Sequence, residues 1–251
     1  MTLSKDFLDQ LGSVARSQLT DVSTGRWEDK GSDLFDPVTK MDRAIEQAMR
    51  TSIQQAFPDD AMLGEEFGWT GQGARRTWSL DPIDGTRAFI CDLPSWAVLV
   101  GVIEDDEHVA GMIDLPALDE RLIAIDGTTL RNGVASRTSG CRDLRSARLS
   151  TTDPNLFSSD EFNDFERLRR ATLVARFGLD AMAYARVATG GIDLVMESGL
   201  KRFDLDALVA VVRGAGGAIG DWSGGSDWDH GRILAAATRE LYDEAVALLA
   251  A

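Results

Sequence analysis

Hydrophobic residues recur at helical spacing near the start of the chain. In residues 6–21 apolar side chains stand three or four positions apart, which predicts an amphipathic first helix. A second stripe of this kind follows Pro37 and ends near Phe57, so we expect a second helix there. Between the two stripes, residues 27–36 are polar and follow no hydrophobic period, which predicts a mobile loop.

Short runs typical of β-strands follow the second helix. They lie close enough along the chain for an antiparallel sheet, and they comprise residues 61–63, 77–80, 96–104, 109–115 and 121–125. Asp105-Asp106-Glu107 is a hairpin-type connection between two of these runs, and residues 116–119 supply another turn.

Beyond residue 140 strand-like and helical patterns alternate, which predicts an α/β half. The expected strands are residues 147–151, 172–176, 192–197, 218–222 and 233–236, and the expected helices are residues 161–170, 181–189, 205–213 and a final one ending at Leu249. We therefore expect two halves, residues 1–135 and 136–251, and a cleft between such halves is a common place for a site.

The overall charge narrows the classes of partner. The 251 residues are 44% hydrophobic and 27% charged, as in ordinary globular proteins, and their net charge is -15. A charge of that sign repels a nucleic-acid backbone, and no basic stripe interrupts it, so nucleic acid is not expected as a partner. An acidic protein that handles an anionic substrate needs a local positive charge, which bound metal ions supply.

Several other protein classes are not expected either. The start of the chain has no signal-peptide pattern, and no apolar run is long enough to cross a membrane. Two isolated cysteines, Cys91 and Cys141, form no disulfide framework, which fits a reducing cytoplasm. We expect both His108 and His230 on the surface, because they lie outside any metal-ligand spacing, and histidine-based catalysis is not expected.

The chemically most informative stretch is residues 78–89, in which a β run ends in acids and turn residues and then becomes helical. Asp81 and Asp84 are oxygen donors on either side of Pro82, and such donors suit Mg²⁺. Gly85 and Thr86 begin the helical segment, whose free N–H groups favour phosphate. The alternative is that the Asp-Pro and Asp-Gly pairs are only turn dipeptides.

Two further acidic elements strengthen the metal interpretation. Gly64-Glu65-Glu66 ends an earlier β run, where the alternative is a solvated turn. Asp204 precedes an apolar helix, where the alternative is an N-cap. Residues 214–217 are glycine-rich but lie between a helix and a strand, so we interpret them as a helix C-cap and turn rather than a phosphate loop.

Together these elements resemble the inositol monophosphatase family of metal-dependent, lithium-sensitive phosphatases, over nearly the whole chain. The family pattern is Gly-Glu-Glu, then Asp-Pro-Ile-Asp-Gly-Thr, then an aromatic-Asp pair before an Ala-rich helix and Ala-Gly-Gly, and all occur here in order. The resemblance implies a fold of alternating α-β-α-β-α layers, a homodimer, and hydrolysis of the phosphate monoester of a small metabolite with two or three Mg²⁺ ions.

The resemblance also assigns roles to residues. The implied metal ligands are Glu65, Asp81, the carbonyl oxygen of Ile83, Asp84 and Asp204. Gly85 and Thr86 would hold phosphate, Glu65 and Thr86 would orient the metal-bound water that attacks phosphorus, and Asp42 would assist them. The loop of residues 27–36 matches the segment that closes over the site. Four carboxylates and three divalent ions leave a positive centre for a dianion.

Within that family, residues 35–39, 84–89 and 200–204 are most similar to the histidinol-phosphate phosphatases. In that branch, acids matching Asp180 and Glu197 lie beside the polar end of the substrate, where a carboxylate suits an ammonium group. Alternatively, Asp180 only caps a helix and Glu197 is a solvated strand end. Inositol phosphate or another cyclitol or sugar phosphate is the rival substrate, and a non-catalytic metal- or phosphate-binding regulator is the rival function.

Overall fold

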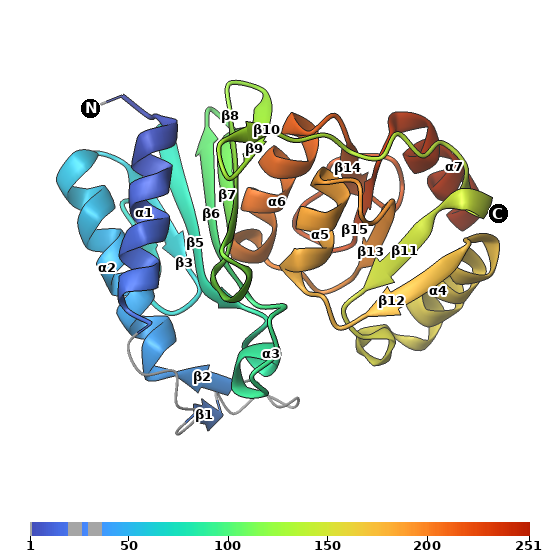
Figure 1. The fold of residues 1–251 in the computed structure, drawn as a ribbon, viewed down its shortest axis with the longest axis horizontal. Helices are drawn as coiled ribbons and strands as arrows, with labels where there is room; N and C mark the ends of the chain where they lie inside the picture. Colours follow the sequence, from blue (N-terminus) through green and yellow to red (C-terminus); the bar gives the residue numbers. More distant parts are fainter. Residues whose placement is uncertain (1, 20–26, 30–36) are drawn as a thin grey trace.

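The computed structural model describes residues 2–19, 27–29 and 37–251. Its helices and two large sheets stack in alternating layers, with a helical layer on each outer side and another between the sheets (Figure 1). The α-β-α-β-α layering implied by the family resemblance is therefore confirmed.

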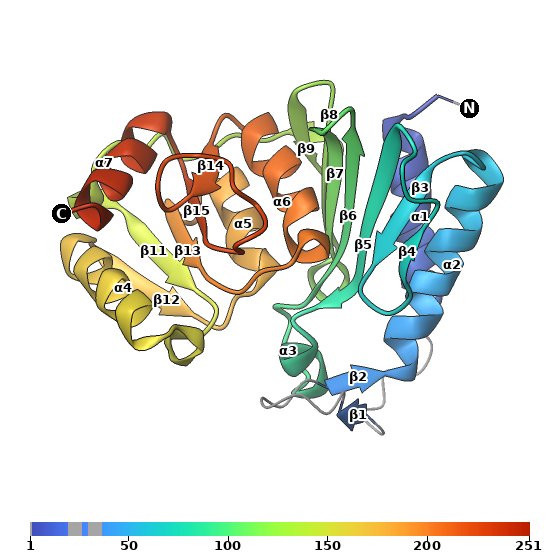
Figure 2. The same ribbon diagram turned by 180° about the vertical axis from the view of Figure 1, so that it is seen from behind.

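The first outer layer consists of α1 (Lys5–Ser17) and α2 (Lys40–Ala56), which pack on each other and on the first sheet (Figure 2). Both helices bury one apolar face, as their spacing predicts. Ser4 caps α1 by accepting a hydrogen bond from the N–H of Phe7 at 3.3 Å. The first helix ends at Ser17 and not at residue 21.

The first sheet has eight strands in the order β10-β9-β8-β7-β6-β5-β3-β4. Their bounds are β3 (Ala61–Gly64), β4 (Gly68–Thr70), β5 (Arg76–Asp84), β6 (Ala97–Glu104), β7 (Glu107–Leu115), β8 (Glu120–Ile125), β9 (Thr128–Arg131) and β10 (Val134–Ala135). Only β3 and β5 run parallel, and the other neighbours are antiparallel. The five predicted runs are confirmed, whereas β4, β9 and β10 are too short to show a period.

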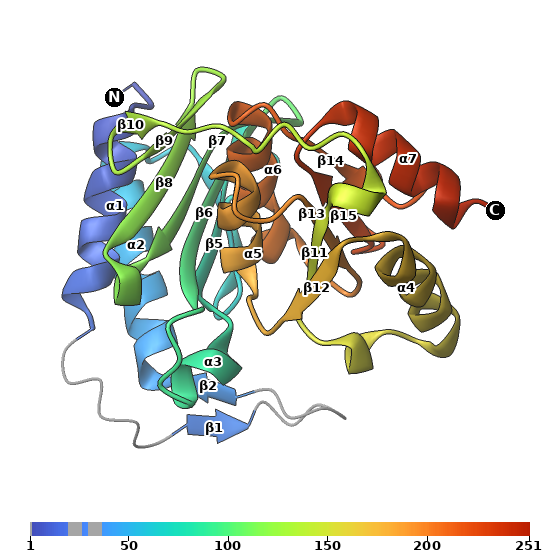
Figure 3. The ribbon, with the colours of Figure 1, turned by 45° about the vertical axis from the view of Figure 1, so that its right-hand side comes forward.

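The central layer consists of α5 (Ala181–Ala188) and α6 (Arg202–Gly214), which lie between the two sheets (Figure 3). The buried face of α6 contacts five strands of the first sheet and β14 of the second. The helix ends at Gly214, and Gly216 has a φ of 89°, so the glycine-rich residues 214–217 are a helix end and turn, as predicted.

The second sheet has five strands in the order β12-β11-β13-β15-β14. They are β11 (Arg148–Thr151), β12 (Val174–Phe177), β13 (Leu194–Glu197), β14 (Ala218–Asp221) and β15 (Ile233–Ala236), and α4 (Ser159–Ala171) and α7 (Arg239–Leu249) cover the outer face. Because β11, β12 and β13 are parallel, their carboxyl ends meet at one edge of the sheet. The predicted alternation of strands and helices is confirmed.

Two expectations for single segments are wrong. Residues Trp27–Asp29 form β1, which pairs with β2 (Pro37–Thr39) although its sequence shows no period, and residues 30–36 of the expected loop lie outside the described residues. The side chain of His108 is buried, and its Nε2 lies 2.8 Å from the buried carboxylate of Asp206 on α6. His230 is exposed, as expected.

Two further points concern membrane-spanning helices and the division of the chain into halves. In the part of the chain that the structure describes, no helix is long and apolar enough to cross a membrane. The first sheet ends at Ala135 and the second begins at Arg148, while the division of the chain into halves at residue 135 stays a prediction.

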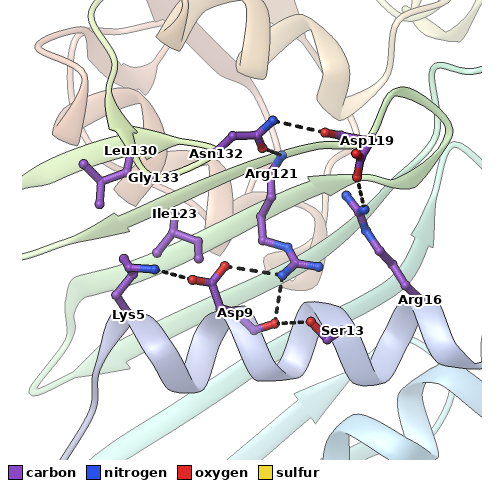
Figure 4. Close-up of a pocket in the computed structure, with 10 residues that line it drawn as sticks. All are labelled: Lys5, Asp9, Ser13, Arg16, Asp119, Arg121, Ile123, Leu130, Asn132 and Gly133. Atoms are coloured by element: carbon purple, nitrogen blue, oxygen red, sulfur yellow. Dashed lines mark hydrogen bonds and ion pairs between the residues drawn. The ribbon is translucent and has the colours of Figure 1, made fainter.

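A charged cluster fastens α1 to the first sheet beside a cavity of about 410 Å³ (Figure 4). Asp114, fully buried on β7, accepts hydrogen bonds at 2.9 Å from Arg16 of α1 and from Arg121 of β8. Arg121 also bonds Asp9, and Arg16 bonds Asp119. Because the arginines at this cavity are paired with acids, the cluster joins elements and offers no uncompensated positive charge to an anion.

Candidate active site

A bulge at the end of β5 brings two predicted metal ligands to one side of the sheet. Side chains three residues apart on a regular strand face opposite sides. Here Asp81 pairs with Leu99 and Asp84 with Ala97, so two residues of β5 oppose one residue of β6. The extra residue turns both carboxylates the same way, and one oxygen each of Asp81, Asp84 and Asp204 lie within 4.8 Å of one another.

Asp204 reaches this cluster from the first turn of α6. One of its oxygens accepts a hydrogen bond from the N–H of Lys201 at 2.8 Å, which stabilises the helix start. The N-cap of α6 is Lys201 and Asp204 is the third residue of the helix, so the interpretation of Asp204 as an N-cap is wrong. The carboxylate that bonds the N–H of Lys201 also belongs to the acidic cluster.

The cluster lies in a cavity of about 270 Å³. The predicted site residues that line it are Glu65, Asp81, Ile83, Asp84, Gly85, Thr86, Asp180, Glu197 and Asp204. Asp42 is buried in the first turn of α2 and is not among the described residues of the cavity wall. One site therefore collects acids from the turn after β3, from β5, from the residue before α5, from the end of β13 and from the start of α6.

The acids of the cluster hold their protons unusually firmly. Burial, together with the charges of Glu65 and neighbouring aspartates, raises the pKa of Asp81 well above its ordinary value. Burial, Asp180 and Asp204 do the same to Asp84, and burial raises the pKa of Asp204 to about 7. Mutually repelling, oxygen-only donors of this kind fit a hard divalent cation such as Mg²⁺, which would offset their charge.

Hydrogen bonds fix the turn that follows Asp81. Its Oδ1 accepts the N–H of Ile83 at 3.0 Å, and the hydroxyl of Thr86 donates to the carbonyl oxygen of Ile83 at 3.0 Å. Gly85 precedes α3 (Thr86–Ile90) with a φ of 79°, a left-handed conformation that favours glycine. The glycine is also needed for space, because a Cβ there would lie 2.9 Å from an oxygen of Asp180.

Asp180 stands at the start of α5, but its side chain does not cap that helix. The N–H of Ala181 donates instead to Asp84 at 2.7 Å, so the interpretation of Asp180 as a mere cap is wrong. Its φ of 47° and ψ of -141° are sparsely populated for a residue with a side chain, and such strain gathers at functional sites. Burial raises the pKa of Asp180 to about 6, against the lowering effect of the positive charge of Arg87.

Glu197 ends β13 and is buried, so its interpretation as a solvated strand end is wrong. It accepts hydrogen bonds from the N–H of Thr152 at 2.7 Å, from the hydroxyl of Thr152 at 3.0 Å and from that of Thr151 at 3.2 Å. Burial nevertheless raises the pKa of Glu197 to about 8. At neutral pH this carboxyl group is therefore mostly protonated in the metal-free protein.

The turn after β3 exposes Phe67, but both acids of the Gly-Glu-Glu element are held against the protein. The N–H of Glu65 donates to the carbonyl oxygen of Leu80 at 3.1 Å, which holds Glu65 against β5. The side chain of Glu66 is 3% exposed and lies 3.6 Å from Arg43. The second acid of the Gly-Glu-Glu element therefore has a packing role that its sequence position did not reveal.

Four further polar residues of the cavity wall were not predicted, namely Arg87, Thr152, Tyr184 and Ser198. Arg87 lies within the motif of residues 78–89 and Thr152 follows a predicted strand, so both could have been found as neighbours of predicted features. The hydroxyl of Tyr184 is buried without a hydrogen-bond partner among the described residues, and burial raises its pKa. Nothing in the apolar pattern of α5 marks it.

Comparison with known proteins agrees with this geometry. A sequence model described as the inositol monophosphatase family matches residues 4–251. The chain belongs to this family. The resemblance noted from three separated motifs is therefore confirmed.

The relatives that resemble this chain are named for different functions. The bifunctional phosphatase IMPL2 of Arabidopsis thaliana is 40% identical over 88% of this chain and 67% of its own length, and a histidinol-phosphatase of Mycobacterium tuberculosis is 34% identical over 85% and 84%. The Nus factor SuhB of Pseudomonas aeruginosa is 33% identical over 82% and 80%. A solved inositol monophosphatase from Zymomonas mobilis superposes with a TM-score of 0.87, at 35% identity over 98% and 97%.

Proposed function

We propose that this phosphatase uses Mg²⁺ to hydrolyse the phosphate monoester of a small metabolite, and that this metabolite is histidinol phosphate, within histidine biosynthesis. The observation that supports it best is the shared cavity: the close oxygens of Asp81, Asp84 and Asp204 line it together with Asp180. A metal-binding end for phosphate and an acid for an ammonium group therefore occur in one small site.

The donor set supports Mg²⁺ as the cofactor. It contains carboxylates and a backbone carbonyl but no thiol or imidazole among the described lining residues, which is the preference of a hard cation. We propose two or three ions, held by Glu65, Asp81, Asp84, Asp204 and the carbonyl oxygen of Ile83. Bound Mg²⁺ would supply Lewis-acid stabilisation of the phosphoryl and leaving oxygens and lower the pKa of the attacking water.

The residues of the chain would position and deprotonate that water. We assign Glu65 as the acceptor of its proton and Thr86 as its orienting partner, with Asp42 supporting Glu65 from α2. The bond between Thr86 and Ile83 fixes the direction of the threonine hydroxyl. Gly85 and Thr86 would hold the phosphoryl group while water forms the new P–O bond and the ester P–O bond breaks, releasing the alcohol and inorganic phosphate.

The charge of Asp180, which lies beside Asp84 and Gly85 in the cavity wall, supports an aminated substrate. With a pKa of about 6, Asp180 is mostly ionised at neutral pH and would form a charge-assisted hydrogen bond to an ammonium group. Glu197, the second substrate-binding residue of this proposal, is mostly protonated in the metal-free protein and is held by the two threonines. Asp180 is therefore the principal charge partner, and an incoming cation would favour the ionised form of Glu197.

Inositol 1-phosphate, or another cyclitol or sugar phosphate, is the rival substrate, and relatives named for inositol phosphatases support it. The deciding experiment measures phosphate release by purified protein with Mg²⁺ from histidinol phosphate, inositol 1-phosphate and a panel of sugar phosphates. We expect the highest kcat/KM for histidinol phosphate. If that ester is turned over no faster than inositol 1-phosphate, the substrate assignment is wrong.

A non-catalytic metal- or phosphate-binding regulator is the rival of another class. The relative named Nus factor SuhB is the observation that supports this alternative. Against it, the positions assigned to metal and water keep side chains competent for catalysis, whereas a regulator could lose Glu65 or Thr86 without penalty. Mg²⁺ binding without phosphate release from any ester of the panel would favour the regulator.

We also propose a homodimer that acts in the cytoplasm and is inhibited by lithium. Both cysteines are free thiols, which fits a reducing compartment. The edge strand β12 and the residue before it expose Leu173, Val174 and Phe177, apolar side chains that a second copy could cover. Light scattering on a size-exclusion column tests the dimer, and phosphate release in rising LiCl against matched NaCl tests the inhibition.

A further inference from the structure

The middle of α2 carries a carboxylate that makes no contact with solvent. Asp42, Glu46 and Arg50 follow one another at four-residue spacing on the buried face of the helix, and Glu46 is 0% exposed. A carboxylate so deeply buried is costly unless hydrogen bonds and an opposite charge surround it. The partners of Glu46 therefore indicate why it is there.

Those partners lie in the turn that joins β3 to β4. One oxygen of Glu46 accepts the N–H of Glu66 at 2.7 Å, and the other accepts the N–H of Phe67 at 3.3 Å and Nε of Arg50 at 2.7 Å. Arg50 in turn donates to the hydroxyl of Thr70 at 3.0 Å and to the carbonyl oxygen of Gly68. Glu46 and Arg50 thus form hydrogen bonds with three successive residues, Glu66, Phe67 and Gly68.

The same contacts explain the glycine before Glu65. A Cβ on Gly64 would lie 1.8 Å from an oxygen of Glu46, so any side chain there would displace the carboxylate. Gly64 has no left-handed backbone, and the requirement is therefore one of space. The glycine of the Gly-Glu-Glu element makes room for Glu46.

Glu65 is consequently held from two sides. Its own N–H donates to the carbonyl oxygen of Leu80 on β5, and the next N–H along the chain donates to Glu46 on α2. These bonds fix the backbone on both sides of the Glu65 Cα, and so the direction in which its carboxylate enters the cavity beside Asp81. Figure 2 shows α2 lying beside β3 and β4.

We propose that Glu46 is a positioning residue, which holds Glu65 in place toward the metal cluster. The proposal rests on the proposed function, since it takes Glu65 as a metal ligand. Residues that orient ligands in this indirect way typically contribute about 10- to 100-fold to metal affinity or activity.

The test compares Glu46→Gln with Glu120→Gln. Glu120 is likewise a buried glutamate, bound to Arg186 at 2.6 Å and to Arg131 at 3.0 Å, but it does not line the described cavity. Mg²⁺ affinity is measured by calorimetric titration, and kcat and KM by phosphate release. For Glu46→Gln we expect roughly 10-fold weaker Mg²⁺ binding and roughly 10-fold lower kcat, with KM changed less than about twofold. Glu120→Gln should bind Mg²⁺ like the wild type.

Equal Mg²⁺ affinities of the two variants would overturn the proposal, because a purely structural glutamate predicts that result. Gly64→Ala is the second variant, and it decides the matter if Glu46→Gln does not fold. Its methyl group displaces the Glu46 carboxylate without changing any charge, so it should reproduce the loss of Mg²⁺ affinity, and wild-type affinity in folded Gly64→Ala would contradict the proposal. Wild-type protein that binds Mg²⁺ but hydrolyses no ester overturns the proposed function only, and the calorimetric comparison still tests Glu46.

Discussion

At the scale of single residues, Asp84 both binds the helix start of α5 and belongs to the acidic cluster. Asp84→Asn keeps an oxygen that can accept the N–H of Ala181 but removes the charge. We expect phosphate release to fall by at least roughly 100-fold, because a direct ligand should matter more than the partners that orient it. The melting temperature should stay equal or rise, since one of several mutually repelling carboxylates is lost. A folded and fully active variant would contradict the metal assignment.

Asp180 tests the substrate assignment in a different way. Asp180→Asn is the suitable change, because asparagine tolerates the positive φ of this position and loses only the charge. We expect KM for an aminated ester to rise roughly 10-fold, the size of a lost charge-assisted hydrogen bond, with little change for a neutral sugar phosphate. The measurement is a pair of saturation curves for each protein. Equal losses for both esters would show that Asp180 shapes the site and does not bind the ammonium group.

At the scale of elements, the attachment of α1 depends on Asp114. Asp114→Asn would leave Arg16 and Arg121 without the carboxylate that neutralises them, and we expect the free energy of unfolding to fall by about 3 kcal/mol. Asp119→Asn is the matched control, because the Asp119 side chain is 91% exposed and its pairing with Arg16 should contribute less than about 1 kcal/mol. Urea denaturation measures both, and KM should not change. Equal losses would contradict the role of burial at Asp114.

The acidic cluster should make the stability of the metal-free protein depend on pH. The pKa of Asp204 is about 7, above its ordinary value of 3.8, so its contribution to stability is complete only below the ordinary value and is lost progressively as the pH rises to about 7. Urea denaturation in EDTA should therefore give a lower free energy of unfolding at about pH 8 than at about pH 5.5. Mg²⁺ should stabilise the protein more at the higher pH, where it displaces fewer protons.

Asp204→Asn is the control for this pH effect. The variant should lose part of the pH dependence in EDTA, because its side chain cannot take up a proton in this range. If Mg²⁺ stabilises wild-type protein equally at both pH values, the acids of the cluster are not competing for protons and metal.

The sequence was informative where one pattern is repeated or where a motif is continuous along the chain. The apolar stripes of α1 and α2 and the run from Asp81 to Thr86 are of this kind, and they located the two helices and the centre of the cavity. The family resemblance added the layered fold and the proposed roles of Glu65, Ile83 and Asp204 as metal ligands.

What the sequence did not reveal depends on partners that lie elsewhere in the chain. His108 looked like a surface residue because its partner, Asp206, lies on a helix 98 positions away. The sequence does not mark Glu46, because its contacts with the turn after Gly64 exist only once α2 packs beside the first sheet. The bulge after Asp81 is likewise a feature of strand pairing, and no local preference predicts it.

At the scale of the whole molecule, the net charge of -15 acts on Mg²⁺ before it reaches the cavity. A field of this sign raises the local concentration of divalent cations, and salt screens it, with a Debye length of about 10 Å at 0.1 M. We expect calorimetric titration to show several-fold weaker Mg²⁺ binding in about 300 mM KCl than in about 20 mM KCl. If the affinity does not change with salt, the long-range field of the protein does not contribute to Mg²⁺ binding, and only the carboxylates close to the metal determine the affinity.

Charge reversals on the surface separate this long-range effect from the effect of the ligands themselves. Glu107 and Asp229 are exposed and do not line the described cavity, so Glu107→Lys and Asp229→Lys leave the ligand set unchanged. Together they make the net charge less negative, and at low salt the double variant should bind Mg²⁺ more weakly than the wild type. At high salt the two affinities should converge, because screening removes the field that the substitutions alter. A difference that persists at high salt would mean that the substitutions disturb the site and not the field.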